Sequence, residues 1–329
     1  MTDHTLLTRM DTHTLLAVIN DMDGGEIVLD KALQVAGSLK IPIHVLQVIF
    51  EPYADFPMPE TIDSGQLRHV IQRDAEARLQ DLIAATQANA HATTHNTTHA
   101  ETDTDIAISS SVIWHKHDWQ AIIDCAQQVQ ASLIMKAMAR PHPGLILKPE
   151  DWHLLRHCQQ HVMLVTPASW QAKPHVMAAV DVHTDGQSKL NGMIVKQAWQ
   201  FAQMLGAELH IVSAFPDLER WLGPISVTID FHQARKKLQV STERKIGEIT
   251  DALGIPNAQI HARQGDATLI IKQMAHHLDA QLLVMGTVQN TGSRGMWLGN
   301  TSEQILSQVH CDVAVIVAQN VAHGTDHAA

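Results

Sequence analysis

The chain repeats itself, and this constrains its fold more than any other feature of the sequence. The expected order of strands and helices runs through once by about residue 170 and then begins again. Short stretches also match in letters: LKIPIHV at 39–45 parallels LGAELHI at 205–211, and His157-Cys158 parallels His310-Cys311. Duplication of one supersecondary unit is the economical explanation. The fold must therefore be one that two similar halves can build.

Within each half, single strands alternate with helices. Apolar runs of strand length and 3.6-residue apolar periodicity predict, in the first half, strands at 13–20, 41–50, 106–114, 132–135 and 162–166, a turn at 21–25, and helices at 26–40, 66–89, 119–130 and 151–158. In the second half they predict strands at 175–181, 207–215, 258–263, 281–285 and 313–318, a loop at 216–224, and helices at 188–205, 232–253, 268–278 and 300–309. Such alternation is typical of parallel sheets covered by helices on both faces.

Length and composition exclude several classes of protein. With 329 residues, 45% apolar and 17% charged, the chain has room for about two packed domains. It has no apolar run of the roughly 18 residues that a membrane span needs, and no secretory signal at the N-terminus. A net charge of −11 argues against nucleic acid or an anionic membrane as partner. Cys125, Cys158 and Cys311 lack CxxC spacing, so we expect reduced, buried thiols in a cytoplasmic protein.

One loop carries the clearest sign of ligand binding. The apolar run 282–285 ends at Gly286, a glycine-containing loop follows, and Asn300 and Thr301 read as the start of a helix. Glycines permit close approach of the backbone, and the free N–H groups at a helix N-terminus attract anions. The loop is neither GxxxxGK[ST] nor GxGxxG.

The spacing instead resembles the nucleotide loop of the universal stress protein family, Gly-x2-Gly-x9-Gly-[Ser/Thr]. Gly286 and Gly299 take the first and third positions, whereas Gln289 and Asn300 stand at the second and fourth. The stretches DWHLLR at 151–156, LIMKA at 133–137 and MGTVQNTG at 285–292 are similar to tandem members of that family. The resemblance implies two Rossmann-like repeats, at 1–170 and 171–320, each with a five-stranded parallel sheet, and then a disordered tail at 321–329.

The resemblance also implies where a nucleotide would bind. In nucleotide-binding relatives, a residue at the place of Asp181 contacts adenine or ribose, and one at the place of Ala214 contacts adenine through its main chain. The phosphate positions correspond to Gly286, Gln289, Gly299, Asn300 and Thr301. Thr287, Ser293 and Arg294 lie in the same loop, where Arg294 could neutralise a phosphate. The expected cofactor is ATP with Mg²⁺.

The first repeat is expected to lack this loop. Lys136, Ala139 and Pro149 occupy its glycine positions, and Glu150 and Asp151 stand at the helix start. Carboxylates there cap the helix themselves and repel phosphate. Relatives pair through their last strand, so we expect 162–166 to pair with 313–318 as a pseudo-dimer, and a homodimer is a further possibility.

Histidine is abundant, with 23 residues. His91, His95 and His99 are spaced by four, which would place three imidazoles on one side of a helix as candidate metal ligands. Their Thr- and Asn-rich surroundings, 91–105, instead favour an exposed loop.

No catalytic residues are predicted. GxSxG is absent, and the serines at 109–111 have no base visible in the sequence. The predicted function is a cytoplasmic stress-response protein that binds a nucleotide or another small anion in the second repeat, regulatory rather than catalytic. Two alternatives stay open: a carrier or sensor of an apolar ligand held between the repeats, and a slow ATPase or phosphotransferase.

Overall fold

The computed structural model describes residues 14–20, 22–52, 64–94, 106–138, 149–222, 230–287 and 300–318. Its first half contains β1 (Thr14–Val18), α1 (Met22–Leu39), β2 (Ile43–Ile49), α2 (Ser64–Thr94), β3 (Ile108–Trp114), α3 (Asp118–Gln128), β4 (Ala131–Ala137), α4 (Pro149–His157) and β5 (His161–Val165). Its second half contains β6 (His175–Ala179), α5 (Ser188–Leu205), β7 (Glu208–Phe215), α6 (Leu218–Leu222), α7 (Phe231–Ala252), β8 (Gln259–Gln264), α8 (Ala267–His277), β9 (Leu282–Thr287), α9 (Asn300–Gln308) and β10 (Asp312–Val317).

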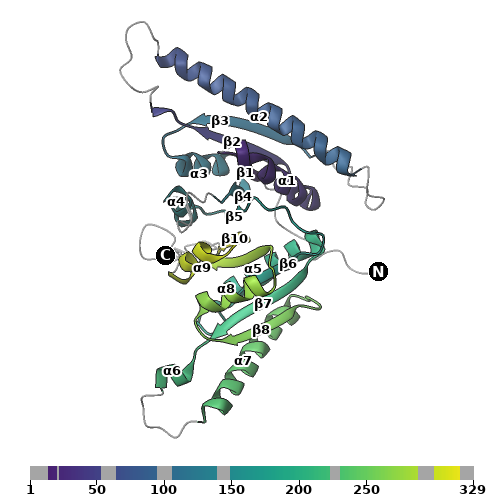
Figure 1. Ribbon diagram of the computed structural model, residues 1–329, viewed down its shortest axis with the longest axis vertical. Coiled ribbons are helices and arrows are strands. Elements are labelled where there is room, and N and C mark those ends of the chain that lie inside the picture. The colour runs from purple at the N-terminus through teal and green to yellow at the C-terminus, as the bar shows by residue number, and fades with distance from the viewer. Residues whose placement is uncertain are drawn as a thin grey trace, which may run out of the picture.

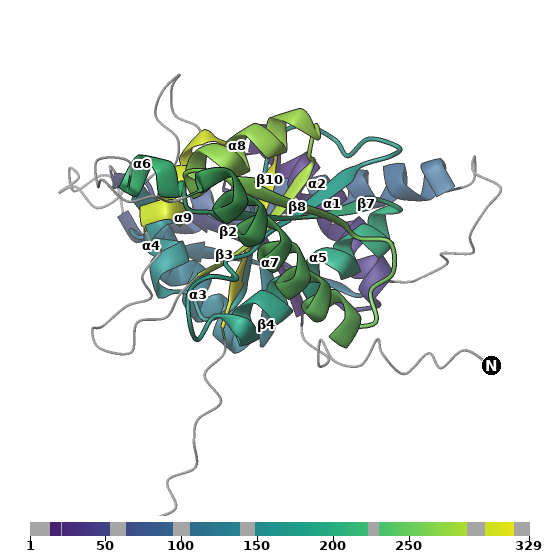
Figure 2. The same cartoon turned by 90° about the horizontal axis from the view of Figure 1, so that it is seen from below.

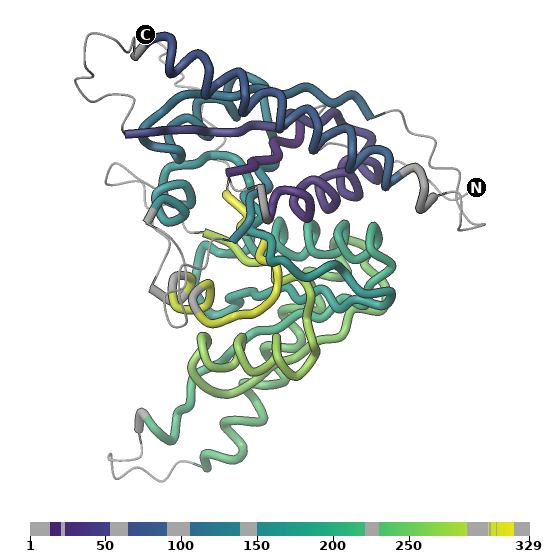
Figure 3. Tube along the Cα trace, turned by 45° about the horizontal axis from the view of Figure 1, so that its top comes forward, coloured from purple at the N-terminus to yellow at the C-terminus, as the bar shows by residue number. Residues whose placement is uncertain are grey.

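All the strands belong to one sheet that runs through the whole molecule (Figure 1). Its order is β3-β2-β1-β4-β5-β10-β9-β6-β7-β8. Neighbours within each half are parallel, whereas β5 and β10 are antiparallel, with Leu164 opposite Val313 and Val162 opposite Val315. The two halves therefore meet strand to strand, as the trace in Figure 3 shows. The predicted tandem α/β repeats and the predicted pairing of their last strands are both confirmed.

Helices cover both faces of this sheet, and each face has its own continuous core. Buried residues of α1, α2, α5 and α7 pack on one face. Those of α3, α4, α8 and α9 pack on the other. Figure 2 shows α5 and α7 on the side of the sheet opposite α8 and α9. Each core passes from one repeat to the next, because the β5/β10 pairing keeps the faces aligned. Burial on both faces explains why the strands read as continuous apolar runs.

Local sequence explains several element ends. The Asp230 side chain caps α7 by accepting from the N–H of Gln233 at 2.9 Å, and Asp266 caps α8 in the same way from Leu269 at 3.1 Å. Gly206 ends α5 in the left-handed conformation, with φ 62°. At the corresponding place after α1, Lys40 adopts φ 54°, which is a costlier choice for a residue with a Cβ.

The structure differs from the sequence-based prediction in three places. α1 begins at Met22, inside the expected turn, and α2 continues to Thr94, inside the expected loop. The expected loop at 216–224 contains the short helix α6. Asp217 caps α6, because its Oδ1 accepts from the N–H of Arg220 at 3.4 Å. None of the described helices is long and apolar enough to cross a membrane.

Strand register gives a residue-by-residue alignment of the two repeats. Leu16 pairs with His44 just as Met177 pairs with His210, so His44 and His210 occupy equivalent positions. The same registers make Lys136 equivalent to Met285, and Ala137 equivalent to Gly286. The predicted equivalence of Lys136 with Gly286 is therefore wrong by one residue.

Candidate functional site

The second repeat contains a cavity of about 820 Å³ at the carboxyl ends of β6, β7 and β9. The strand order places β7 on one side of β6 and β9 on the other. The chain crosses the sheet in opposite directions from this point, which is where open α/β sheets leave a crevice for ligands. Residues of α5, α6, α8 and α9 complete the walls. The position follows from the order of the strands and does not depend on any one loop.

Asp181 lies at the mouth of this cavity, two residues beyond the end of β6. Its carboxylate accepts hydrogen bonds from Thr184 Oγ1 at 2.6 Å and from the backbone N–H groups of His183 and Thr184 at 2.9 and 3.1 Å. Burial raises the pKa of Asp181, but these hydrogen bonds outweigh burial and hold the pKa below its usual value. Asp181 is therefore ionised at neutral pH, and part of its capacity as an acceptor serves its own turn.

Asn191 on α5 fixes the backbone of Asp181. Its Nδ2 donates to the Asp181 carbonyl at 2.6 Å, and its Oδ1 accepts from the Asp181 N–H at 3.2 Å. Asn191 is buried and also lines the cavity. Sequence reasoning did not select this residue, although a buried-face asparagine in an otherwise apolar helical pattern is a signal that a backbone group needs a partner.

Ala214 and Gly286 also line the cavity, at the ends of β7 and β9. Gly286 has a packing reason to be glycine. A Cβ at this position would lie 2.8 Å from Ile194 Cδ1 and 2.9 Å from Leu190 Cδ1, both on α5. This close packing of β9 on α5 was not predicted. The approach of the Gly286 backbone to an anion stays a prediction.

The charged groups around the cavity are mostly acidic. Asp217, Asp266 and Asp181 all line it, and Arg220 on α6 is the cation among its described lining residues. Gln264 Nε2 donates to Asp217 at 2.9 Å, while Asp266 caps α8. Apolar residues from both sides of the sheet also line the cavity: Leu190, Ile194, Phe215, Ile271, Met285 and Ile305. This lining suits a group that has a flat apolar surface and hydrogen-bond donors at its edge, because carboxylates accept but do not donate.

The other predicted site residues divide into two groups. Thr287 is fully buried at the end of β9 and does not line the cavity. Asn300 and Thr301 begin α9, whose next residue, Ser302, lines the cavity. The remaining four lie outside the described residues: Gln289, Ser293, Arg294 and Gly299. Of the candidate metal ligands, His91 lies in the last turn of α2, and His95 and His99 lie outside the described residues.

The corresponding place in the first repeat is filled by an internal ion pair. Lys136 Nζ lies 2.5 Å from Asp151 Oδ1, and the two side chains are 6% and 0% exposed. Asp151 stands in the first turn of α4, as expected, and is also the buried partner of the lysine, which was not predicted. Because Lys136 takes the place of Met285, a charge pair stands where the second repeat has part of its apolar lining.

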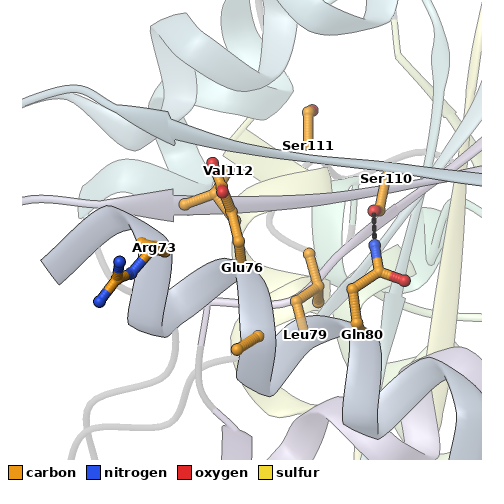
Figure 4. Close-up of a pocket in the computed structure, with 8 residues that line it drawn as sticks. Arg73, Glu76, Leu79, Gln80, Ser110, Ser111 and Val112 are labelled. Carbon is orange, nitrogen blue, oxygen red and sulfur yellow. Dashed lines mark hydrogen bonds between the residues drawn. The ribbon is translucent and has the colours of Figure 1, made fainter. Parts of the chain in front are cut away.

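A smaller cavity of about 420 Å³ lies between α2 and the edge strand β3 (Figure 4). Arg73, Glu76 and Gln80 face it from the helix, and Ser110 and Val112 from the strand. Gln80 Nε2 donates to Ser110 Oγ at 2.7 Å, and Gln72 Nε2 donates to the Val112 carbonyl at 3.2 Å. These hydrogen bonds pair polar groups of the edge strand β3 with side chains of α2. None of the predicted site residues lines this cavity.

Cys125, Cys158 and Cys311 are buried and are in the thiol form, as predicted. Burial raises the pKa of Cys158 to about 12 and also raises the pKa of Cys125. Thiols with such pKa values stay protonated and are poor nucleophiles at neutral pH.

Comparison with known proteins agrees with the fold. The family model described as "Universal stress protein family" matches residues 12–166 and again residues 174–317. Universal stress protein E of Escherichia coli K12 is 30% identical over 222 residues, which are 64% of this chain and 68% of that protein.

Two solved structures resemble the whole chain. A functionally unknown protein from Pseudomonas aeruginosa PAO1 has a TM-score of 0.65 at 23% identity, covering 96% of this chain and 95% of its own. A universal stress protein from Archaeoglobus fulgidus DSM 4304 has a TM-score of 0.59 at 16% identity, covering 93% and 99%. At these identities the likeness shows the fold alone.

Proposed function

The chain belongs to the universal stress protein family, and from this premise we propose that its second repeat binds a nucleotide in the cavity between β6, β7 and β9. The observation that carries the proposal is the joint presence of Asp181, Ala214 and Gly286 around one cavity of about 820 Å³. These residues come from three strands, and the family resemblance assigns all three to nucleotide contacts. The binding is proposed to be regulatory, in a cytoplasmic protein.

The lining indicates how the nucleotide would lie. The apolar lining residues, such as Leu190, Phe215 and Ile305, suit the faces of a purine ring. The carboxylates of Asp181 and Asp217 suit the amino and hydroxyl donors of base and ribose. Phosphates would be repelled by these carboxylates, so they would lie toward Arg220 or the N-terminus of α9, where Ser302 lines the cavity. Mg²⁺ bound to the phosphates would reduce the repulsion.

The first repeat is proposed to be structural. The buried Lys136–Asp151 ion pair occupies the equivalent region and, among the described residues, leaves no free cation there for a phosphate. One nucleotide per chain is therefore expected, and the repeats are proposed to divide near residue 170, at 1–170 and 171–320.

The alternative, an apolar ligand between the repeats, has less support from the geometry. The repeats meet through direct pairing of β5 and β10 and through a buried polar junction around Asp312. An apolar ligand would fit the apolar lining of the same cavity better than the region between the repeats. Ligand identity therefore has to be tested at this one cavity.

The experiment fills the cavity without touching its polar groups. We would measure binding of ATP with Mg²⁺, and of adenosine, to the full-length protein by native mass spectrometry and calorimetry. Ala214→Leu places a larger side chain at the cavity wall, and Val48→Leu makes a similar change at the equivalent position of β2 in the first repeat. Gly286→Asp is a poorer variant, because the added side chain would meet Leu190 and Ile194 even with no ligand present.

The expected result is one ATP per chain, retained by Val48→Leu and weakened at least about tenfold by Ala214→Leu. Adenosine should keep a large share of the binding, because the described lining suits the nucleoside. Equal binding by both variants would overturn the proposed location. An absence of bound ATP, together with an apolar adduct that organic solvent releases, would establish the carrier function instead.

A further inference from the structure

Three histidines lie in a row across neighbouring strands of the second repeat, away from the cavity. His175 is the first residue of β6, His210 lies near the start of β7, and His261 lies near the start of β8. His175 Nδ1 is 2.9 Å from His210 Nε2, and His210 Nδ1 is 3.0 Å from His261 Nε2. The row is at the amino ends of the strands, whereas the cavity is at their carboxyl ends.

A carboxylate joins this row. Glu208 stands opposite His175 in the β6/β7 register, and its Oε2 lies 4.0 Å from His210 Nε2. One ligand atom each from His175, Glu208 and His210 can be chosen so that all three lie within 4.8 Å of one another. The Glu208 side chain is 64% exposed, and its carboxylate accepts a hydrogen bond from Gln259 Nε2 at 2.8 Å. Because this side chain is exposed, it can rotate toward the imidazoles.

In the first repeat, the histidine equivalent to His210 has a different set of neighbours. His44, the equivalent of His210, is flanked by Ser109 Oγ and Ser111 Oγ, each at 2.8 Å. By register, Thr14 and Pro42 take the places of His175 and Glu208, and Ser111 takes the place of His261. Hydroxyl groups thus satisfy the histidine fully in that repeat. The second repeat has a metal-ligating side chain at each of these places.

The row could also be a chain of neutral imidazoles that hydrogen-bond one another. That arrangement satisfies the nitrogens, but it uses three imidazoles where two hydroxyls suffice in the first repeat.

We propose that His175 Nδ1, His210 Nε2 and the Glu208 carboxylate bind a Zn²⁺ ion. Two imidazole nitrogens and one carboxylate oxygen are a zinc donor set that leaves the fourth position to water. His261 would orient the His210 ring. When His210 Nε2 binds the metal, His210 Nδ1–H donates a hydrogen bond to His261 Nε2. The ion would join β6 to β7 at the end of the sheet opposite the cavity, so the site is independent of the proposed nucleotide.

The test compares matched variants of the full-length protein, because a chain with 23 histidines will bind some zinc elsewhere. Metal is first removed with a chelator, and zinc affinity is then measured by competition with a chromophoric chelator. His210→Gln, His175→Gln and Glu208→Gln remove one ligand each. The last of these changes an exposed side chain, so we expect the fold to be retained. His44→Gln is the control, at the equivalent position of the first repeat.

The wild type and His44→Gln are expected to share one tight site that each ligand variant weakens at least about tenfold. Co²⁺ should give visible absorption bands in the wild type that are lost in His175→Gln and Glu208→Gln. Zinc should raise the Tm of the wild type but not that of His210→Gln. Zinc and Co²⁺ binding that survives unchanged in all three ligand variants would overturn the proposal and would place the metal at other histidines, such as those at 91, 95 and 99.

Discussion

Lys31 Nζ lies 2.7 Å from Asp312 Oδ2, with the two side chains only 2% and 1% exposed. The pair joins α1 of the first repeat to β10 of the second across 281 positions of sequence. Asp312 also accepts from the N–H and the hydroxyl of Thr166, each at 2.7 Å, and from Trp170 Nε1 at 2.8 Å. One carboxylate therefore holds together a helix, a strand end and the link between the repeats.

The β5/β10 pairing has a second contact of the same kind. The N–H of Val317 donates to His161 Nδ1 at 3.2 Å, just as the N–H of Thr166 donates to Asp312. By strand register, His161 is the equivalent of Asp312, and Thr166 the equivalent of Val317. The junction thus keeps an approximate two-fold symmetry of backbone contacts, with a carboxylate on one side and an imidazole on the other.

Removal of Asp312 is expected to destabilise the protein more than removal of Lys31. Asp312→Ala leaves Lys31 buried with the Thr166 carbonyl at 3.2 Å as its remaining hydrogen-bond partner, and an unpaired buried charge costs about 3–5 kcal/mol. Lys31→Met leaves Asp312 with three donors, so we expect about 1–3 kcal/mol. Urea unfolding of both variants and of the double variant measures the difference. A larger loss in Lys31→Met would contradict this account.

The free energy of unfolding is expected to decrease at acid pH because His161 becomes protonated. Burial lowers the pKa of His161 to about 4, whereas an unfolded histidine titrates near 6.5. The unfolded state therefore binds a proton first as pH falls. The stabilisation is complete above about pH 6.5 and is lost as pH falls toward 4, by up to about 3 kcal/mol.

The check is unfolding free energy measured between pH 7 and pH 4. His161→Asn should flatten this dependence, and His69→Asn, at an exposed position of α2, should not. His210 titrates in the same window, so part of the slope should remain in His161→Asn. If the free energy of unfolding depends on pH equally in the wild type, His161→Asn and His69→Asn, protonation of His161 does not destabilise the fold.

The buried pair of the first repeat is expected to be replaceable as a unit. Asp151→Ser alone leaves Lys136 without its carboxylate and should cost about 3–5 kcal/mol. The second repeat has Met285 at the position of Lys136, and Ser302 is the third residue of α9 as Asp151 is of α4. The double variant Lys136→Met with Asp151→Ser copies these residues and should recover most of that loss. Thermal unfolding of the single and double variants tests this. Recovery of none of the stability would mean that the pair has contacts the second repeat lacks.

Lys40 offers a stabilising change. It ends α1 with φ 54°, where Gly206 ends α5 with φ 62°. A left-handed residue with a Cβ is strained, and glycine at this position removes the strain. Lys40→Gly is expected to raise the unfolding free energy by about 0.5–1 kcal/mol, and Gly206→Ala to lower it by a similar amount. Guanidinium unfolding of both variants should give opposite shifts of midpoint; equal signs would contradict the equivalence.

Much of the fold is present in local sequence. Apolar strands and 3.6-residue periodicity depend only on neighbours in the chain, so the order of elements was predicted almost completely, with α5 placed at its observed bounds. Asp181, Ala214 and Gly286 were selected through the family resemblance, and each follows or ends a strand, where the strands of a parallel sheet meet at one edge. Local patterns could not show that Gly286 packs against Leu190 and Ile194, because these residues lie on a helix 92 to 96 positions earlier.

Contacts between distant segments were decided by tertiary structure alone. Lys31 and Asp312, Lys136 and Asp151, and the row His175, His210 and His261 carry no local signal, because each depends on which strands become neighbours and in what register. Sequence determined that the chain forms two parallel α/β repeats, and it predicted a ligand site at the strand ends of the second. Tertiary structure decided which charges are buried as pairs and which imidazoles meet, since burial and distance are properties of the packed sheet and not of the chain.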